Sequence, residues 1–351
     1  MAFAQISDVA VRGISACVPK NIEENSELGI LSEDEKAKLI PTIGVERRRL
    51  VTDDVCTSDL CFHAAEKLID ELGWEKSEID CLIFVTQTPD YRIPATACIL
   101  QERLALPQTC LAFDVNLGCS GWVLGLQTIS SLISAGKLRK GLLLCGDTCT
   151  KKPACRNNKS TWPLFGDAGT ATAVEAVPGE SMKFHAATDG SGFGAIIVPD
   201  GGSRNLFSLK SLEEYVGPDG NVTTRLSCYL DGMEVFSFAQ SEAPRSVKKL
   251  CEHFSIAREN VDCFSFHQAN FSLNERIREK LKLPPEKVPY SLKNFGNTSS
   301  ASIPLTLVTE RADALRGGAM KHVACGFGVG LSWGSVYFET DKICVPALVE
   351  I

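Results

Sequence analysis

Two stretches of the sequence lie half a chain apart and resemble one another, and this repeat restricts the possible folds more than any other feature. EIDCLIFVTQ (residues 78–87) and NVDCFSFHQA (260–269) both place an acidic residue and a cysteine before a strand-like apolar run. The matched cysteines, Cys81 and Cys263, are 182 positions apart in a chain of 351 residues. A repeat at this offset indicates that each unit spans about half of the chain.

A second pair of cysteines repeats at nearly the same offset. Cys145 in LLLCGD and Cys325 in HVACGF are 180 positions apart. Two landmarks with similar offsets favour a duplication over a chance likeness between short apolar strands. We therefore expect an N-terminal half over residues 1–185 and a related C-terminal half over residues 186–351.

Short apolar runs alternate with longer amphipathic segments, a pattern that is typical of α/β proteins. CLAFDV (110–115) predicts a buried strand, and residues 121–136 predict a helix whose apolar positions recur at spacings of three and four, with Gly136 as its C-cap. Residues 294–318 predict a glycine-bearing turn and then a helix that carries Pro304 in its first turn. If the halves pack face to face, these two loop-to-helix junctions meet at one cleft.

Composition excludes several classes of protein. No apolar run approaches the roughly 18 residues of a membrane span, and the N-terminus lacks the basic start and long apolar stretch of a secretory signal. A net charge of −7 argues against broad nucleic-acid binding. The 15 cysteines are scattered through apolar runs, and their spacing fits neither a disulfide framework nor a zinc ribbon. We expect a cytoplasmic protein that binds no metal, membrane or nucleic acid.

One long segment lacks any regular pattern. Residues 199–231 are rich in Gly, Asp and Ser. A loop of that length in a compact domain is usually functional or disordered. We interpret it as a flap over a substrate channel, with a plain surface excursion as the alternative.

Cys119 lies in NLGCSGW, between a strand-like run and a helix-like run. Unpaired N–H groups and the positive end of the helix dipole favour a thiolate at such a place. Flanking Gly118 and Gly121 would let a substrate carbonyl approach the backbone closely. A thiolate so placed suits covalent acyl transfer through a thioester, whereas the alternative is a buried structural cysteine.

Two polar residues of the C-terminal half add to this hypothesis. His267 follows an apolar strand directly, where it can act as an acid, a base or a hydrogen-bond donor. Asn297 lies in a glycine turn before a helix. Each alone is ordinary strand-end or turn chemistry, but the three residues together are far more specific than any one of them.

The motifs NLGCSGW, FHQAN, FGNTSSASIPL and GFGVGLSWG, in this order, resemble the thiolase superfamily and specifically its 3-oxoacyl-acyl-carrier-protein synthase III group. GISACVPKN, TIGVERRRL, LFGDAGTATAVE and LDGMEVFSFA also look like family landmarks, so the resemblance covers essentially the whole chain. It implies a five-layer αβαβα fold made of two duplicated halves. This agrees with the internal repeat, which rests on the sequence alone.

The resemblance also implies a reaction. Cys119 matches the family nucleophile, and His267 and Asn297 match the pair that stabilises the enolate formed when a malonyl thioester loses carbon dioxide. This carbanion then attacks the acyl-Cys119 thioester, and backbone N–H groups of Cys119 and Val329 hold the tetrahedral oxyanion. Val329 stands where the family more usually has glycine.

Further positions take roles only through the resemblance. It implies a homodimer that needs no cofactor beyond its acyl-CoA or acyl-carrier donor and malonyl-carrier substrates, with an acyl carrier protein as partner. Ile93, from a neighbouring subunit, would line the acyl tunnel. The other substrate-binding positions are Leu164, Phe165, Asn270, Leu331 and Lys159, and carrier docking falls to Arg276 and Lys280.

Four departures from the family pattern concern the acyl donor. Lys38 and Thr42 stand where the family has the Trp and Arg that sandwich the adenine of coenzyme A, Lys159 replaces a further Arg, and Ser272 replaces an Arg that faces the carrier. Without the stacking platform, the sequence favours a divergent synthase III with a carrier-bound donor. The alternatives are acyl transfer to oxygen or nitrogen and a catalytically silent partner subunit, which typically lacks the cysteine.

Overall fold

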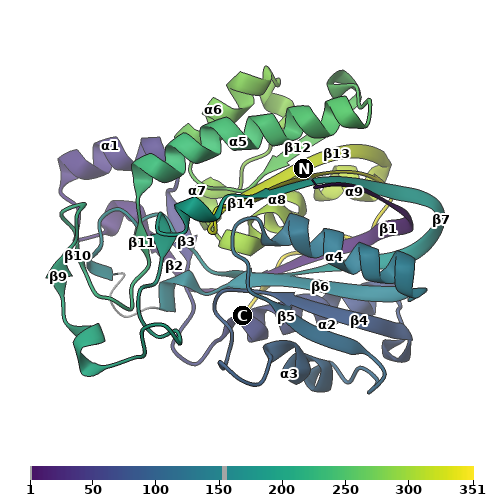
Figure 1. The fold of residues 1–351 in the computed structure, drawn as a ribbon, viewed down its shortest axis with the longest axis horizontal. Coiled ribbons are helices and arrows are strands. Elements are labelled where there is room, and N and C mark those ends of the chain that lie inside the picture. Colours follow the sequence, from purple (N-terminus) through teal and green to yellow (C-terminus); the bar gives the residue numbers. More distant parts are fainter. Residues whose placement is uncertain (1, 152–155) are drawn as a thin grey trace.

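The computed structural model describes residues 2–151 and 156–351, which form five layers. Figure 1 shows two sheet layers with helices between them and helices on both outer faces. The central helices are α4 (Gly121–Gly136) and α8 (Ser302–Glu310). One outer face carries α2 (Thr57–Leu72) and α3 (Thr96–Arg103), and the other carries α5 (Gly232–His253) and α6 (Phe271–Leu281). The expected αβαβα fold is confirmed.

Two long strands link the two sheet layers. β1 (Ala2–Val18) pairs antiparallel with β7 (Ala168–Thr188) along most of its length. The first part of β7 also pairs with β6 (Lys140–Asp147), and its last part pairs with β14 (Ser332–Asp341). Since β7 runs through residues 185 and 186, the two expected halves share a strand, and the boundary between them stays a prediction.

The remaining strands extend the sheets on either side. The order is β12-β13-β14-β7-β6-β4-β5, in which β4 is parallel to both β5 and β6, and β12 is parallel to β13. Their bounds are Ile79–Val85 for β4, Leu111–Val115 for β5, Cys263–Phe266 for β12 and Ala319–Gly328 for β13. The shorter elements are β2 (Ile22–Glu24), α1 (Glu33–Ile43), β3 (Arg47–Arg49), β8 (Ile196–Ile197), β9 (Tyr215–Val216), β10 (Val222–Thr223), β11 (Tyr229–Leu230), α7 (Leu292–Phe295), α9 (Ala312–Gly317) and β15 (Val349–Glu350).

The first repeat pair occupies equivalent places in the fold. Cys81 on β4 and Cys263 on β12 are both buried in the apolar cluster of the central layer. Phe84 and Phe266, which lie three residues further along, face the outer helices of their own halves. The sequence match between these two stretches therefore reflects equivalent positions in the two halves of the fold.

The alignment of Cys145 with Cys325 in the second repeat is wrong. Cys145 faces the central layer, whereas Cys325 faces α5, where its Sγ lies 3.9 Å from the carbonyl oxygen of Ala243. Cys145 is in register with Val85, but Cys325 is in register with Phe266, the counterpart of Phe84. The two cysteines thus differ by one strand position, and successive strand residues point to opposite faces.

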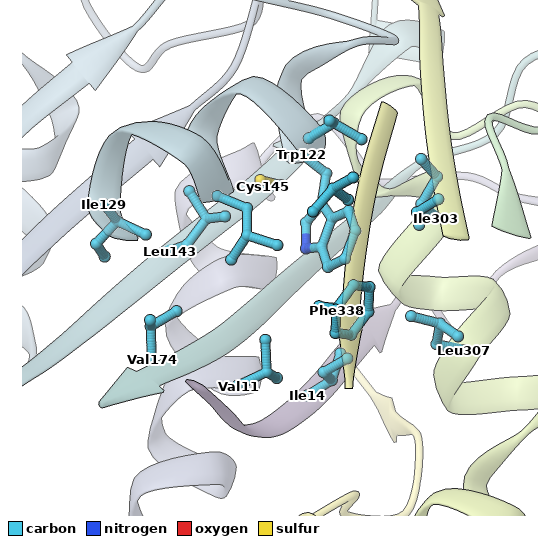
Figure 2. Packing of buried hydrophobic residues seen from close by; sticks show 14 of the residues in the cluster. Val11, Ile14, Trp122, Ile129, Leu143, Cys145, Val174, Ile303, Leu307 and Phe338 are labelled. Atoms are coloured by element: carbon cyan, nitrogen blue, oxygen red, sulfur yellow. The ribbon is translucent and has the colours of Figure 1, made fainter. Parts of the chain in front are cut away.

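The central layer holds the largest apolar cluster, part of which Figure 2 shows. Trp122 and Ile129 of α4 and Ile303 and Leu307 of α8 are buried there, as the helical spacing of α4 predicts. The indole N–H of Trp122 donates to Thr172 Oγ1 at 3.0 Å, so its polar atom is satisfied as well. This packing fixes the N-terminus of α4, where Cys119 lies.

Three local expectations need correction. Residues 110–115 were expected to form a buried strand, but β5 is an edge strand and Leu111 is exposed. Gly136 is the last residue of α4, and the left-handed C-cap is Lys137. The single helix expected within 294–318 is divided at Arg311 into α8 and α9, whereas Pro304 does lie in the first turn of α8.

Residues 199–231 contain only a 3-10 turn and two-residue strands. Several apolar side chains of this segment are exposed: Leu206, Phe207, Leu209, Leu212, Tyr215 and Val216. Throughout the described ranges, no helix is long and apolar enough to cross a membrane.

Candidate active site

Cys119 lies two residues before α4, at the edge where β4 and β5 end. A Cβ on Gly328, the last residue of β13, would lie 2.7 Å from the Cβ of Cys119 and 3.0 Å from its Sγ. The end of β13 therefore packs directly against the nucleophile, at a distance that only glycine allows. Gly328 and Cys119 line the same cavity.

The glycines beside Cys119 have a different role from the expected one. A Cβ on Gly118 would overlap with Oε1 of Gln87, and a Cβ on Gly121 would lie 2.6 Å from Cγ1 of Val85. These two glycines thus admit neighbouring side chains, whereas the expectation was that they admit a substrate carbonyl. It is Gly328 that keeps the space beside the sulfur open.

His267 follows β12 and is almost fully buried. Its backbone N–H donates to Cys325 O at 2.9 Å, and its carbonyl accepts from Asn274 Nδ2 at 3.0 Å. The ring nitrogen Nδ1 pairs with Ser302 Oγ at 2.8 Å. The ring lines the cavity, and Nε2 is the nitrogen on the side away from Ser302.

Asn297 follows Gly296, whose φ of 64° ends α7 in a turn. Its backbone N–H donates to Leu164 O at 2.9 Å, which ties the turn to the N-terminal half. Its side-chain Oδ1 accepts from the N–H of Ser299 at 2.9 Å, and its Nδ2 lies 3.4 Å from Ala269 O. With the oxygen engaged, the amide can present its Nδ2 donor to the cavity.

One cavity of about 150 Å³ brings the three predicted residues together. Four other expected positions also line it: Leu164, Phe165, Asn270 and Val329. Three other expected positions do not line this cavity. Leu331 is buried beside Gly192, Lys159 pairs with Glu35, and Ile93 is 87% exposed on the surface of this chain.

Burial dominates the electrostatics of this site. It raises the pKa of the Cys119 thiol to about 12, and the nearby Asp147 carboxylate adds to that rise. Burial therefore outweighs the expected preference of the helix terminus for a thiolate. Burial also lowers the pKa of His267 to about 3. The resting pair is a neutral thiol and a neutral imidazole.

Asp147 was missed by the sequence reasoning. This buried carboxylate at the end of β6 accepts from the N–H of Gln87 at 2.7 Å and from Thr86 Oγ1 at 3.1 Å. It also accepts from Ser300 Oγ at 3.0 Å, so it joins the N-terminal half to the turn that carries Asn297. Burial raises its pKa above the ordinary value. Among the described residues, no group of three or more His, Cys, Asp or Glu side chains could hold a metal ion.

Hydrogen bonds tie the irregular segment to the residues that directly precede Thr161 in the cavity wall. Lys159 Nζ pairs with Glu35 Oε1 at 2.8 Å, which links the loop before the cavity to α1. The Asn221 side chain accepts from the Lys159 N–H and donates to Ser160 Oγ, both at 3.0 Å. Leu230, the next-to-last residue of the segment, lines the cavity. Its role as a flap stays a prediction.

The residues expected to meet the carrier lie on α6. Arg276 is exposed there, whereas Lys280 donates to Gln240 O at 3.0 Å. Ser272, which replaces a family Arg, donates instead to the carbonyl oxygen of Thr42 at 2.8 Å. This position therefore joins α6 to α1.

Comparisons with known proteins show which family this chain resembles. Residues 113–190 match the family described as 3-oxoacyl-[acyl-carrier-protein (ACP)] synthase III, and residues 251–340 match its C-terminal part. A protein of Geobacillus kaustophilus named beta-ketoacyl-[acyl-carrier-protein] synthase III is 31% identical over 330 residues, which are 92% of this chain and 96% of that protein.

Solved structures give the same result. A 3-oxoacyl-(acyl-carrier protein) synthase from Burkholderia xenovorans LB400 superposes with a TM-score of 0.94 at 36% identity, over 100% of this chain and 99% of that chain. A 3-oxoacyl-(acyl carrier protein) synthase III from Pseudomonas aeruginosa PAO1 gives a TM-score of 0.83 at 28% identity, over 97% and 100% of the two chains.

Proposed function

The chain belongs to the 3-oxoacyl-[acyl-carrier-protein] synthase III family, and we propose that it joins an acyl group held on Cys119 to a malonyl thioester with loss of carbon dioxide. The observation that carries this proposal is that Cys119, His267 and Asn297 line one cavity. They come from three separate loops, each placed at the end of a strand or helix. The thioester substrates supply the reactive groups, so we expect no bound cofactor.

In the first step Cys119 takes the acyl group. His267 Nε2 accepts the thiol proton, and the sulfur attacks the carbonyl carbon of the acyl donor. The donor thiolate then leaves and receives the proton from the imidazole. Since both groups rest in their neutral forms, the proton moves as the substrate binds, and no preformed thiolate is required.

In the second step the malonyl thioester loses carbon dioxide and leaves an enolate. His267 Nε2–H and Asn297 Nδ2–H donate to the enolate oxygen, where each such donor supplies roughly 3 kcal/mol of stabilisation. This step needs the opposite imidazole tautomer from the first. The Ser302 hydroxyl serves both tautomers, because it can accept from or donate to Nδ1 at the observed 2.8 Å.

In the third step the enolate carbon attacks the acyl-Cys119 carbonyl. We assign the role of holding the tetrahedral oxyanion to the backbone N–H groups of Cys119 and Val329, and this is supported by the presence of both residues, with Gly328, on the cavity wall. Collapse of the oxyanion breaks the bond to the Cys119 sulfur, the resulting thiolate takes up a proton from solvent, and the 3-oxoacyl thioester leaves. Replacement of the family glycine by Val329 keeps the backbone donor.

Two partners complete the proposal. Exposed Arg276 on α6 offers a cation to an acidic acyl carrier protein. Ile93 projects into solvent from this chain, which fits insertion into the acyl tunnel of a second copy in a homodimer. A cytoplasmic location, expected from the cysteine usage, stays a prediction.

Intact-mass measurement tests the proposal directly. The wild-type protein should gain one acyl mass from an acyl-CoA or acyl-carrier donor, and should then release carbon dioxide from malonyl carrier. Cys119→Ala should gain no mass, and Asn297→Ala should gain the mass but lose carbon dioxide release by about 100-fold. Acylation without decarboxylation in the wild type would instead identify a simple acyltransferase.

A further inference from the structure

We propose that Gln87 selects the acyl group, and that the preferred acyl chain carries an uncharged hydrogen-bonding substituent, such as a hydroxyl, close to the thioester. This inference rests on the proposed function and deepens it. The family motifs in this sequence do not include Gln87, but the structure places it on the cavity wall beside the nucleophile.

Parallel strand pairing brings Gln87 to Cys119. β4 and β5 run side by side in parallel, and the N–H of Thr86 continues the pairing by donating to Val115 O at 3.2 Å. Both strands therefore end at the same edge, with Gln87 on one and the Gly118–Cys119 turn on the other. The amide oxygen of Gln87 fills the space that a Gly118 side chain would take, so the amide packs against the residue that precedes Cys119 in the chain.

The Gln87 amide is anchored at its backbone and uncommitted at its tip. Its backbone N–H donates to Asp147 Oδ1 at 2.7 Å. Within residues 2–151 and 156–351, its side chain has no hydrogen-bond partner, and the residue is exposed. Neighbouring polar atoms are already engaged: Thr88 Oγ1 pairs with Thr57 at 2.7 Å, and Thr150 Oγ1 donates to Asp167. The Gln87 amide is thus available to bind a substrate.

An apolar acyl chain is a poor match for that amide. The chain would displace water from two N–H donors and one carbonyl acceptor without replacing their hydrogen bonds, which is unfavourable. A hydroxyl or keto group on the chain can replace them. A site that hydrogen-bonds a substrate hydroxyl also rejects the analogue that lacks it.

The other residues that line the cavity disfavour a negatively charged substituent on the acyl chain. Among the described residues that line the cavity there is no lysine or arginine, so an anionic group would find no cation. The Asp147 carboxylate lies on the same wall and would repel it. A short hydroxyacyl or oxoacyl group meets both conditions.

The test compares rates of Cys119 acylation by intact mass. The donors are the N-acetylcysteamine thioesters of butanoic, 3-hydroxybutanoic and succinic acids, which avoid any dependence on coenzyme A or a carrier. We expect the wild type to use the 3-hydroxybutanoyl donor about tenfold more efficiently than the butanoyl donor, as one hydrogen bond in such a site supplies. We expect succinyl transfer to be the slowest.

Gln87→Met keeps the length of the side chain and removes its hydrogen bonds. In this variant the tenfold preference should fall to about one, with the butanoyl rate rising, while Gln127→Met on the surface of α4 should keep the wild-type preference. Gln87→Leu serves as a second variant. If the wild type shows equal rates with the two donors, or if Gln87→Met keeps the preference, the inference is overturned. If none of the three donors acylates Cys119, the proposed function fails as well, so the two failures are distinguishable.

Discussion

Substitution of Gly328 by alanine should slow the acylation of Cys119 while the protein stays folded. The new Cβ would lie 2.7 Å from the Cβ of Cys119, and an ordinary contact begins near 3.4 Å, so the two must separate by about 0.7 Å. Both atoms are held by backbone, at the end of β13 and at the start of α4, so neither side chain can rotate away. The separation therefore shifts the backbone that positions the sulfur and the Val329 N–H.

The magnitude follows from this displacement. A misplacement of 1 Å at a reacting centre can cost about 100-fold in rate, so a shift of this size should slow acylation of Cys119 by roughly 10- to 100-fold. Overpacking should lower the free energy of unfolding by about 1–3 kcal/mol, which leaves a folded protein to assay.

Intact-mass kinetics and urea unfolding measure the two effects separately. Gly194→Ala is the matched control, because a Cβ at Gly194 meets no atom within 4 Å, and both its acylation rate and its stability should stay at the wild-type level. If Gly328→Ala acylates as fast as the wild type, then the end of β13 does not position the nucleophile, and this reasoning is refuted.

Three further predictions follow from the same geometry. Burial raises the pKa of Cys119 to about 12, so its thiolate fraction should rise about tenfold per pH unit from pH 7 to 10. The rate of Cys119 alkylation by iodoacetamide, measured by peptide mass, should rise by the same factor. A plateau of this rate in that range would contradict the burial effect. The pKa of His267 falls from the ordinary 6.5 to about 3 in the folded state. Between pH 6.5 and pH 3, His267 is therefore protonated in the unfolded state and neutral in the folded state. Stability should therefore fall as the pH drops below 6.5, and urea unfolding of His267→Asn should show a shallower fall; an equal slope would count against a neutral buried imidazole. Ile93→Trp should block longer acyl donors before shorter ones, and an unchanged chain-length preference in acylation assays would mean that Ile93 does not reach a tunnel in a second copy.

The positions of the three predicted site residues follow from local sequence signals. Cys119 precedes a helix with clear apolar periodicity, His267 follows a short apolar run, and Asn297 follows a glycine in a turn. Each signal places its residue at the end of an element. If the two related halves pack face to face, the loops at these element ends meet at one cleft, so the convergence of the three residues on one cavity could be predicted.

Other features depend on residues that are distant in the sequence. Gly118 and Gly121 looked like openings for a substrate, but the side chains that fill the space, from Gln87 and Val85, belong to a neighbouring strand. Asp147 follows an apolar run, as many strand-end residues do, and its partner Ser300 lies 153 positions away in the sequence. Patterns within a window of a few residues contain no information about such partners.

The antiparallel pairing of β1 with β7 has a consequence for the newly made chain. Residues 2–17 pair with residues 169–186, and residues 17–18 pair with 349–350 near the other end of the chain. At the usual pace of protein synthesis, β1 waits on the order of ten seconds or more for its partner strand to emerge. Throughout this interval the 17 residues that form β1 lack the partner strand that satisfies their N–H and C=O groups in the folded protein. Productive folding of this protein should therefore depend on chaperones or on low expression temperature far more than its final stability would indicate.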